Sequence, residues 1–229
     1  MAIYETWLDK SILNPSIQID GYDMLRCDRK DRLGGGVLIY FKSAIAARIL
    51  VSSEYDTPKC ASEFLITEFR INNLALLFAV IYRPHRVKHP LQFFKNIERL
   101  LPSYKHFVMT GDLNANMCTT NTFSKPILDF IKQNALYLIY SDTTCHTVFG
   151  DSWLDIFITT CPQAVLNYSK SSVPIYEFHD TIELKLNFFK PLPIKNFLKA
   201  RDFSNFDKDR FNKHLDSIFT STALPNYVN

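Results

Sequence analysis

The segment Gly111-Asp112-Leu113-Asn114 carries the residue types in this chain that are best suited to chemistry. It directly follows the apolar run Phe107-Val108-Met109, and side chains two positions apart past a strand end can face one pocket. The Asp112 carboxylate could bind a hard cation or take a proton from water, while the Asn114 amide could hold a phosphate oxygen. An Asx-rich turn would explain an isolated Asp-x-Asn better, so the interpretation depends on what accompanies it.

The elements that must position these residues are mostly strands. Short apolar or β-branched runs that end at polar or turn residues predict buried strands. These runs are residues 37–41, 64–69, 74–82, 106–110 and 154–159. Two segments, Pro90 to Leu101 and Lys125 to Ala135, have apolar residues at helical spacing. Interleaved helices and a majority of strands predict a layered α/β fold.

Gly34-Gly35-Gly36 precedes a predicted strand. A phosphate-binding loop would need a helix N-terminus after it, so a glycine turn at the strand start is the better interpretation.

The composition narrows the class of protein. Of 229 residues, 47% are hydrophobic, enough for a buried core, and the net charge of +3 is compatible with a phosphate-bearing partner without requiring one. The five cysteines form no C-x-x-C pair, which favours free thiols over disulfides or a zinc site. Since no apolar run is long enough for a membrane span and residues 1–5 do not resemble a signal peptide, we expect a soluble intracellular protein.

The composition changes near Pro191-Leu192-Pro193. We therefore expect a domain over residues 1–190, followed by a linker and one amphipathic helix over residues 191–229. The apolar residues of that helix are Phe203, Phe206, Phe211, Leu215 and Phe219.

Several short segments from about residue 3 to residue 186 form an ordered set. They are Glu5-Thr6-Trp7-Leu8, Gly21-Tyr22, Arg26-Cys27-Asp28-Arg29, Gly34-Gly35-Gly36-Val37, Ile81-Tyr82-Arg83-Pro84, Gly111-Asp112-Leu113-Asn114, Trp153-Leu154-Asp155 and His179-Asp180. In their order and spacing they resemble the endonuclease/exonuclease/phosphatase family, and more narrowly the endonuclease domain of non-LTR retrotransposons. The tail from Arg201 also resembles the connection to a reverse transcriptase in such elements.

The resemblance implies a four-layer α/β sandwich, with two packed and mainly antiparallel sheets flanked by helices. It implies Mg²⁺, or alternatively Mn²⁺, held by Glu5 and Asp112. DNA would be the substrate, a reverse transcriptase domain would be the partner in the parent architecture, and nuclear access would follow from a chromosomal target. No membrane is implied.

The resemblance also assigns site residues. Asp112 would orient or deprotonate water, Asn114 would donate to phosphoryl oxygens, and Tyr82 would lie near the scissile phosphate. His179 would stabilise the transition state, with Asp155 bound to its other ring nitrogen. The remaining predicted contacts with the phosphate backbone are Arg83 and Thr147, with Thr144 fitting the family's threonine equally well.

Two departures bear on activity. The family carries an Asn on a first strand before the segment of Glu5, and this chain begins almost at that Glu, so we expect the first strand to be missing. The family's site ends in Ser-Asp-His, where this chain has Glu177-Phe178-His179. Phenylalanine neither binds Mg²⁺ nor transfers a proton, and Glu177 would serve instead only with an irregular backbone.

Two functions therefore stand as hypotheses. One is a Mg²⁺-dependent DNA endonuclease of retrotransposon type with impaired activity. The other is an inactive remnant that binds nucleic acid or has no function. A phosphoinositide or sphingomyelin phosphodiesterase ranks lower, because Glu5-Thr6-Trp7-Leu8 and the tail fit a mobile-element nuclease better.

Overall fold

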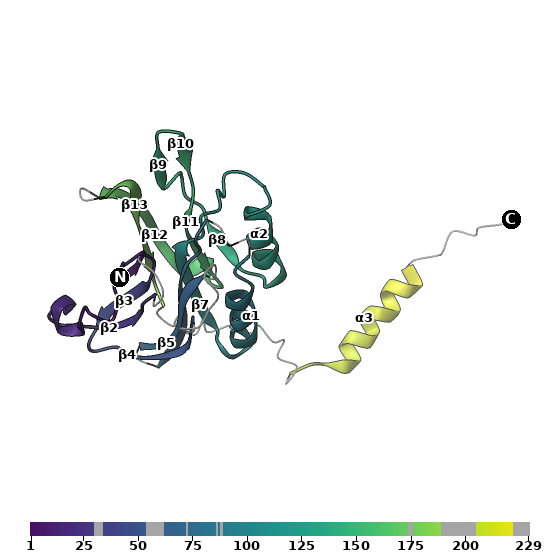
Figure 1. Cartoon of the computed structure of the whole chain (residues 1–229). Coiled ribbons are helices and arrows are strands. Elements are labelled where there is room, and N and C mark those ends of the chain that lie inside the picture. Colours follow the sequence, from purple (N-terminus) through teal and green to yellow (C-terminus); the bar gives the residue numbers. More distant parts are fainter. Residues whose placement is uncertain are drawn as a thin grey trace. The chain divides into compact units, whose positions relative to one another are not determined.

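The computed structural model describes residues 1–29, 34–53, 62–71, 73–85, 87, 89–173, 176–188 and 205–221. The chain divides into two units, Met1–Phe188 and Phe189–Asn229. The second unit contains helix α3 (Lys208–Ser221), which lies in the predicted amphipathic segment (Figure 1). The predicted linker at residues 191–193 and the start of the tail at residues 201–203 lie outside the described residues.

A six-stranded sheet forms the centre of the first unit (Figure 1). Its strand order is β4 (Ala46–Ser52), β5 (Glu63–Ile71), β6 (Leu74–Tyr82), β7 (His106–Asp112), β11 (Asp155–Thr159) and β8 (Tyr137–Ile139). Strands β6 and β7 are parallel, and the other neighbours are antiparallel. A parallel pair needs a crossover, and helix α1 (Leu91–Leu100) lies in the connection between these two strands.

Helices α1 and α2 (Ser124–Gln133) pack on one face of this sheet. The apolar residues at helical spacing are the buried ones, among them Phe93, Ile97 and Ile127. The rings of Phe94 and Phe130 stack with centroids 4.0 Å apart, which fixes the two helices against each other.

Two smaller sheets lie on the other face. One has the order β1 (Ala2–Tyr4), β3 (Val37–Lys42), β2 (Tyr22–Cys27), and the other has the order β10 (Gly150–Ser152), β9 (Cys145–Thr147), β13 (Tyr176–Leu186), β12 (Val165–Val173). Side chains of both contribute to a second core with the inner face of the six-stranded sheet. Short 3-10 helices complete the unit at Asn14–Ile17, Leu101–Ser103 and Pro162–Ala164.

The predicted α/β sandwich is confirmed, with packed, mainly antiparallel sheets flanked by helices. Each of the five predicted strands and both helices of the first unit is present. Strands β1, β2, β4, β8, β9, β10, β12 and β13 were not predicted. Four cysteines are described (Cys27, Cys118, Cys145 and Cys161), and all are free, while Cys60 lies outside the described residues. None of the described helices has the length and apolar character needed to cross a lipid bilayer.

Strand register brings three site residues into one row. Tyr82 on β6 lies opposite Asp112 on β7, and Asp112 lies opposite Asp155 on β11. Residues paired in this way on neighbouring strands project from the same face of a sheet. This face is the one covered by the two smaller sheets, since Tyr82 belongs to the core that they share.

Gly111 allows strands β6 and β7 to approach each other directly before Asp112. Its φ is 155°, and a Cβ atom there would collide with the carbonyl oxygen of Ile81, its partner in the parallel ladder. The carbonyl is backbone, so it cannot move aside without opening the ladder.

We predict that Gly111→Ala lowers the free energy of unfolding by on the order of 2–4 kcal/mol, because strain and collision act together. Urea unfolding would measure the loss. Gly150→Ala is the matched control, since Gly150 has a φ of 126° and open space around its Cβ position. Equal losses in the two variants would show that the collision with Ile81 contributes nothing.

Candidate active site

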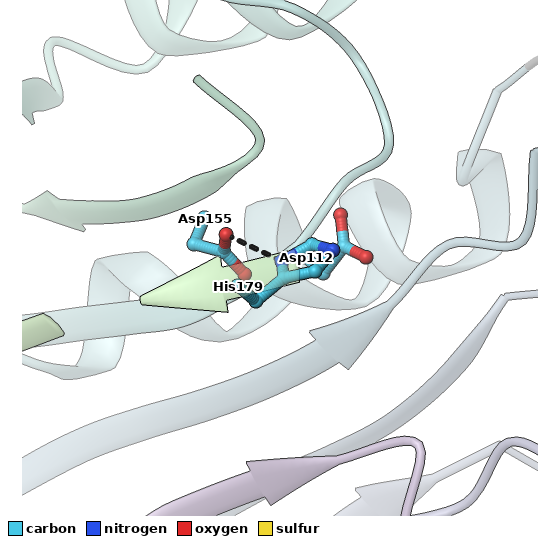
Figure 2. A group of neighbouring side chains, drawn as sticks. All are labelled: Asp112, Asp155 and His179. Atoms are coloured by element: carbon cyan, nitrogen blue, oxygen red, sulfur yellow. Dashed lines mark hydrogen bonds and ion pairs between the residues drawn. The ribbon is translucent and has the colours of Figure 1, made fainter. Parts of the chain in front are cut away.

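Asp112, Asp155 and His179 converge between the sheet layers (Figure 2). One potential ligand atom from each of the three lies within 4.8 Å of the others. Asp112 and Asp155 come from adjacent strands of the six-stranded sheet, and His179 comes from β13 across the interface. The sequence prediction placed these three residues in one pocket, and the structure does bring them together.

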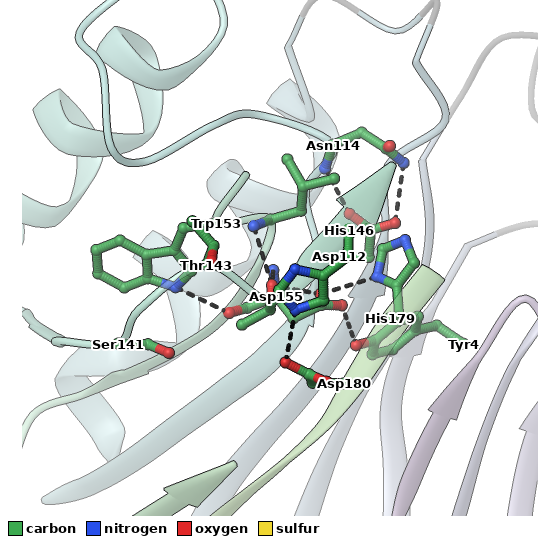
Figure 3. Close-up of polar contacts among 12 residues, drawn as sticks. Tyr4, Asp112, Asn114, Ser141, Thr143, His146, Trp153, Asp155, His179 and Asp180 are labelled. Atoms are coloured by element: carbon green, nitrogen blue, oxygen red, sulfur yellow. Dashed lines mark hydrogen bonds and ion pairs between the residues drawn. The ribbon is translucent and has the colours of Figure 1, made fainter. Parts of the chain in front are cut away.

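The Asp155 carboxylate is fully buried and accepts hydrogen bonds from three side chains (Figure 3). Oδ2 lies 2.9 Å from Nδ1 of His179 and 2.6 Å from Oγ1 of Thr144. Oδ1 accepts the hydroxyl of Tyr4. Because a carboxylate only accepts, Nδ1 of His179 carries the proton and the imidazole is held in a fixed orientation.

The charge state of His179 follows from this contact. Burial by itself lowers the pKa of His179, but the hydrogen bond and negative charge of Asp155 outweigh it, with help from Asp112 and Glu5. The net effect raises the pKa of His179 above its ordinary value. The imidazolium is therefore favoured, which suits a group that stabilises developing negative charge.

Asp112 and Asn114 are bound to each other in the turn after β7. Oδ1 of Asp112 accepts the backbone N–H of Asn114 at 2.7 Å, and Oδ2 accepts its side-chain amide at 3.0 Å. Asn114 has a φ of 46°, the left-handed region that asparagine tolerates better than most residues. The second amide hydrogen of Asn114 goes to the carbonyl of Arg83 at 2.9 Å. Both amide hydrogens are engaged within the protein, so the predicted donation to phosphate would have to replace one of these bonds.

Asp112 has the electrostatics of a general base that works near neutral pH. Burial, and then the negative charge of Asp155, raise the pKa of Asp112 to about 7, with a smaller contribution from Glu5. The N–H of Asn114 and the charge of His179 act in the opposite direction. A base whose pKa lies near the working pH combines availability with proton affinity.

Glu5 and Tyr82 form a second pair beside this group. The Tyr82 hydroxyl donates to Oε1 of Glu5, which follows the end of β1 and has a φ of 54°. A left-handed glutamate is uncommon and costs free energy, so the surrounding structure must hold it in place. Burial and the bond to Glu5 raise the pKa of Tyr82, and its hydroxyl therefore remains a donor rather than a base.

These residues fit a divalent cation. The carboxyl groups of Glu5 and Asp155 lie close enough to Asp112 that their negative charges raise its pKa. Asp112 itself is only 3% exposed. A cation would offset that repulsion, and carboxylate oxygens are the ligands that Mg²⁺ prefers. Asp112 is the predicted ligand found in the three-residue cluster, whereas Glu5 lies beside it, bound to Tyr82.

The structure gives Arg83 a different role from the predicted phosphate contact. Its side chain is 1% exposed, and its guanidinium donates to the carbonyl oxygens of Leu113, Val87 and Asn114. A guanidinium that is buried and bonded in this way is not presented to a substrate.

The structure also separates the two candidate threonines. Thr144 is fully buried and lies in the Asp155 network, where its Oγ1 also accepts the backbone N–H of Asp155 at 3.0 Å. Thr147 lies at the exposed turn between β9 and β10 and donates to the carbonyl of Gly150. The His146 ring between them contacts Asp151 and Asp180, each at 3.0 Å. Thr144 thus lies in the Asp155 network, whereas Thr147 lies at the exposed end of β9.

Tyr4 is a site residue that sequence reasoning missed. Tyr4 is the last residue of β1, directly before Glu5, and its hydroxyl donates a hydrogen bond to Asp155. Burial, and then the charge of Asp155, raise the pKa of Tyr4 well above its ordinary value, so the hydroxyl stays protonated. The signal in the sequence was the position of Tyr4, which ends the apolar run Ala2-Ile3-Tyr4 directly before Glu5-Thr6-Trp7-Leu8.

Phe178 on β13 is 49% exposed and directly precedes His179. The side chain of Glu177 lies outside what the structure describes. Whether Phe178 takes the place of a site carboxylate therefore stays a prediction from the sequence.

The raised pKa of Asp112 predicts a pH-dependent stability. Between its ordinary value of 3.8 and about 7, the folded state binds a proton that the unfolded state releases. Stability is therefore lost as the pH rises through this window. We expect Asp112→Asn, measured in a chelator, to match the wild type near pH 4 and to exceed it by on the order of 1–3 kcal/mol near pH 8.

Urea unfolding at several pH values checks this expectation. Asp129→Asn, on the exposed side of α2, is the control and should change stability by less than about 0.5 kcal/mol at every pH. A difference between Asp112→Asn and wild type that stays constant with pH would contradict the raised pKa.

Similarity to known proteins is found among solved structures. No protein-family model matches the chain, and no curated protein sequence matches it. Among solved structures, the endonuclease domain of TRAS1, a telomere-specific non-LTR retrotransposon, aligns with a TM-score of 0.59 and 11% identity over 75% of this chain and 83% of that one. The 3′ phosphatase NExo from Neisseria, bound to a product DNA hairpin, aligns at 0.57 with 10% identity over 82% and 88%.

A third similar structure is an endonuclease/exonuclease/phosphatase protein from Bacteroides vulgatus, with a TM-score of 0.54 and 16% identity over 76% of this chain and 79% of that one. At these identities the likeness concerns the fold. The chain has the α/β sandwich fold of the endonuclease/exonuclease/phosphatase proteins, a fold that nucleases and phosphatases share.

Proposed function

We propose that this chain is a Mg²⁺-dependent DNA endonuclease of retrotransposon type whose rate is reduced by Phe178. The observation that carries the proposal is the hydrogen bond between Asp155 and His179, which faces Asp112 across a gap of at most 4.8 Å. A buried carboxylate that orients an imidazolium, with a second carboxyl group facing the pair, provides the groups that phosphodiester hydrolysis uses.

Each residue then has a role that its environment supports. Asp112 accepts the proton of the attacking water, and Asn114 holds Asp112 in the required orientation. His179 stabilises the negative charge on the pentacovalent phosphorus, with Asp155 fixing its tautomer. Tyr82 donates to Glu5 and holds the carboxylate at the edge of the site.

Mg²⁺, when bound, would neutralise charge on the phosphate and lower the pKa of a coordinated water. Glu5 and Asp112 are the proposed ligands, and Mn²⁺ is the proposed substitute.

DNA is proposed as the substrate, because two proteins of similar fold are a retrotransposon endonuclease and a phosphatase bound to a DNA hairpin. The net charge of +3 is compatible with phosphate contacts whose affinity falls with salt.

Residues 191–229 are proposed as a connection to a reverse transcriptase domain. Within them α3 exposes Phe211, Ile218 and Phe219. Slower amide exchange in α3 on addition of such a domain would support this role, and unchanged exchange would remove it.

A plasmid-nicking assay tests the proposed activity. We expect the wild type to relax supercoiled DNA with Mg²⁺ or Mn²⁺ and not in a chelator. Asp112→Asn should nick more slowly by on the order of 10²- to 10⁴-fold, because the proton acceptor is lost. This variant is expected to be the more stable one, so unfolding would not explain its loss of activity. Asp129→Asn should behave as wild type, and equal nicking by wild type and Asp112→Asn would refute the proposal.

Phe178 favours a second candidate, an inactive remnant that binds nucleic acid. Phe178→Asp separates the two, with Phe178→Asn as the matched control of similar size and no charge. If the chain is an impaired enzyme, Phe178→Asp should nick faster by on the order of 10-fold or more, and Phe178→Asn should not. Equal, background nicking in both variants, with DNA binding retained, would favour the remnant.

A further inference from the structure

Arg83 is the largest fully buried side chain of the described residues, and it lies directly behind the candidate site. It follows Tyr82 at the end of β6. Its Nε donates to the carbonyl of Leu113, its Nη2 donates to that of Asn114 at 2.6 Å, and its Nη1 donates to that of Val87. One guanidinium thus joins the turn after β6 to the turn after β7.

Main-chain bonds reinforce the same junction. The N–H of Arg83 donates to the carbonyl of Asp112 at 2.9 Å, and the amide of Asn114 donates to the carbonyl of Arg83 at 2.9 Å. Asn114 is therefore held from both sides, by its side chain and by its own carbonyl. Its left-handed conformation, at a φ of 46°, is strained for most residues and needs such support.

A guanidinium is suited to this position in a way that lysine is not. It carries donors in a rigid planar fork, which can reach carbonyls on two turns at once, whereas an ammonium is a single point with three donors. The ring of Phe123 lies 5.3 Å from Cζ of Arg83 and contributes to its enclosure. Carbonyl oxygens of two loops, rather than a carboxylate, accept its hydrogen bonds.

We propose that Arg83 is a positioning residue, which acts on the reaction through Asn114 and Asp112 without touching substrate. Its guanidinium holds the carbonyls of Leu113 and Asn114, so that the Asn114 amide stays bound to Asp112. The effect on rate rests on the proposed nuclease function. The effect on the conformation of the turn does not.

Arg83→Lys tests the inference with two independent measurements. The matched control is Arg70→Lys, since Arg70 is exposed and pairs with Glu68 away from this junction. The first measurement is amide hydrogen exchange over residues 112–116, which needs no activity. We expect exchange there to become faster by about tenfold or more in Arg83→Lys, with the core strands β5 and β6 unchanged and with no change at residues 112–116 in Arg70→Lys.

The second measurement is nicking kinetics. We expect Arg83→Lys to lower kcat by on the order of 10²-fold with KM changed less than about twofold, because misplacement of Asp112 affects the transition state more than binding. A raised KM, an unchanged kcat and a shallower salt dependence would instead indicate a phosphate contact and overturn the inference.

The two failures are distinguishable. Unchanged exchange over residues 112–116 in Arg83→Lys overturns the positioning role whatever the activity. Uniformly faster exchange across the whole unit overturns it too, because Arg83 would then support only global stability. A wild type that nicks no DNA, together with locally faster exchange in Arg83→Lys, sinks the proposed function and leaves the positioning role intact.

Discussion

The carboxylate of Asp155 accepts hydrogen bonds that join the three sheets of the described residues. Asp155 belongs to β11 of the six-stranded sheet, Tyr4 to β1 of the three-stranded sheet, and His179 to β13 of the four-stranded sheet. Thr144 supplies a further bond from the segment that leads into β9. A buried carboxylate without donors would cost several kcal/mol. The layers must therefore pack in the one register that brings all these donors to Asp155, and the candidate site forms as a consequence of that packing.

The buried charge of Asp155 also disfavours the ionised form of the neighbouring Asp112 and so costs folding free energy. Asp155 is satisfied by three side chains, whereas Asp112 is buried beside it and feels its charge, so the pKa of Asp112 rises to about 7. A network built only to hold the sheets together would not need this second carboxylate, and an apolar or amide side chain would fit with less repulsion. Glu5, in a left-handed conformation, is a second costly feature of the same region. Strain and repulsion concentrated at one place are typical of sites that bind or react.

The sequence allowed the central sheet to be predicted and left much of the outer layer unpredicted, for a physical reason. Strands β6 and β7 are continuous apolar runs because both of their faces are buried, and such runs are easily recognised. Strand β13 mixes polar and apolar residues over Tyr176–Leu186, and the three polar residues His179-Asp180-Thr181 interrupt their alternation. The interruption weakens the period-2 signal by which a half-buried strand is recognised. Asp112, Asp155 and His179 were found through the resemblance, since their meeting depends on register and layer packing that spacing does not encode. The burial of Arg83 and Thr144 could not be read from residue type, because arginine and threonine are usually exposed.

The apolar side chain at position 178 leaves the hydrogen bonds of the Asp155 network in place. The bonds to Asp155 come from Tyr4, Thr144 and His179, and the bonds to Asp112 come from Asn114, so replacement of a carboxylate at position 178 removes none of them. The described sheets can therefore assemble with an apolar residue at position 178. The residues whose hydrogen bonds join the sheets at Asp155 and the residues proposed for the reaction therefore overlap only in part. The Asp155 network therefore gathers Asp112 and His179 whatever residue stands at position 178.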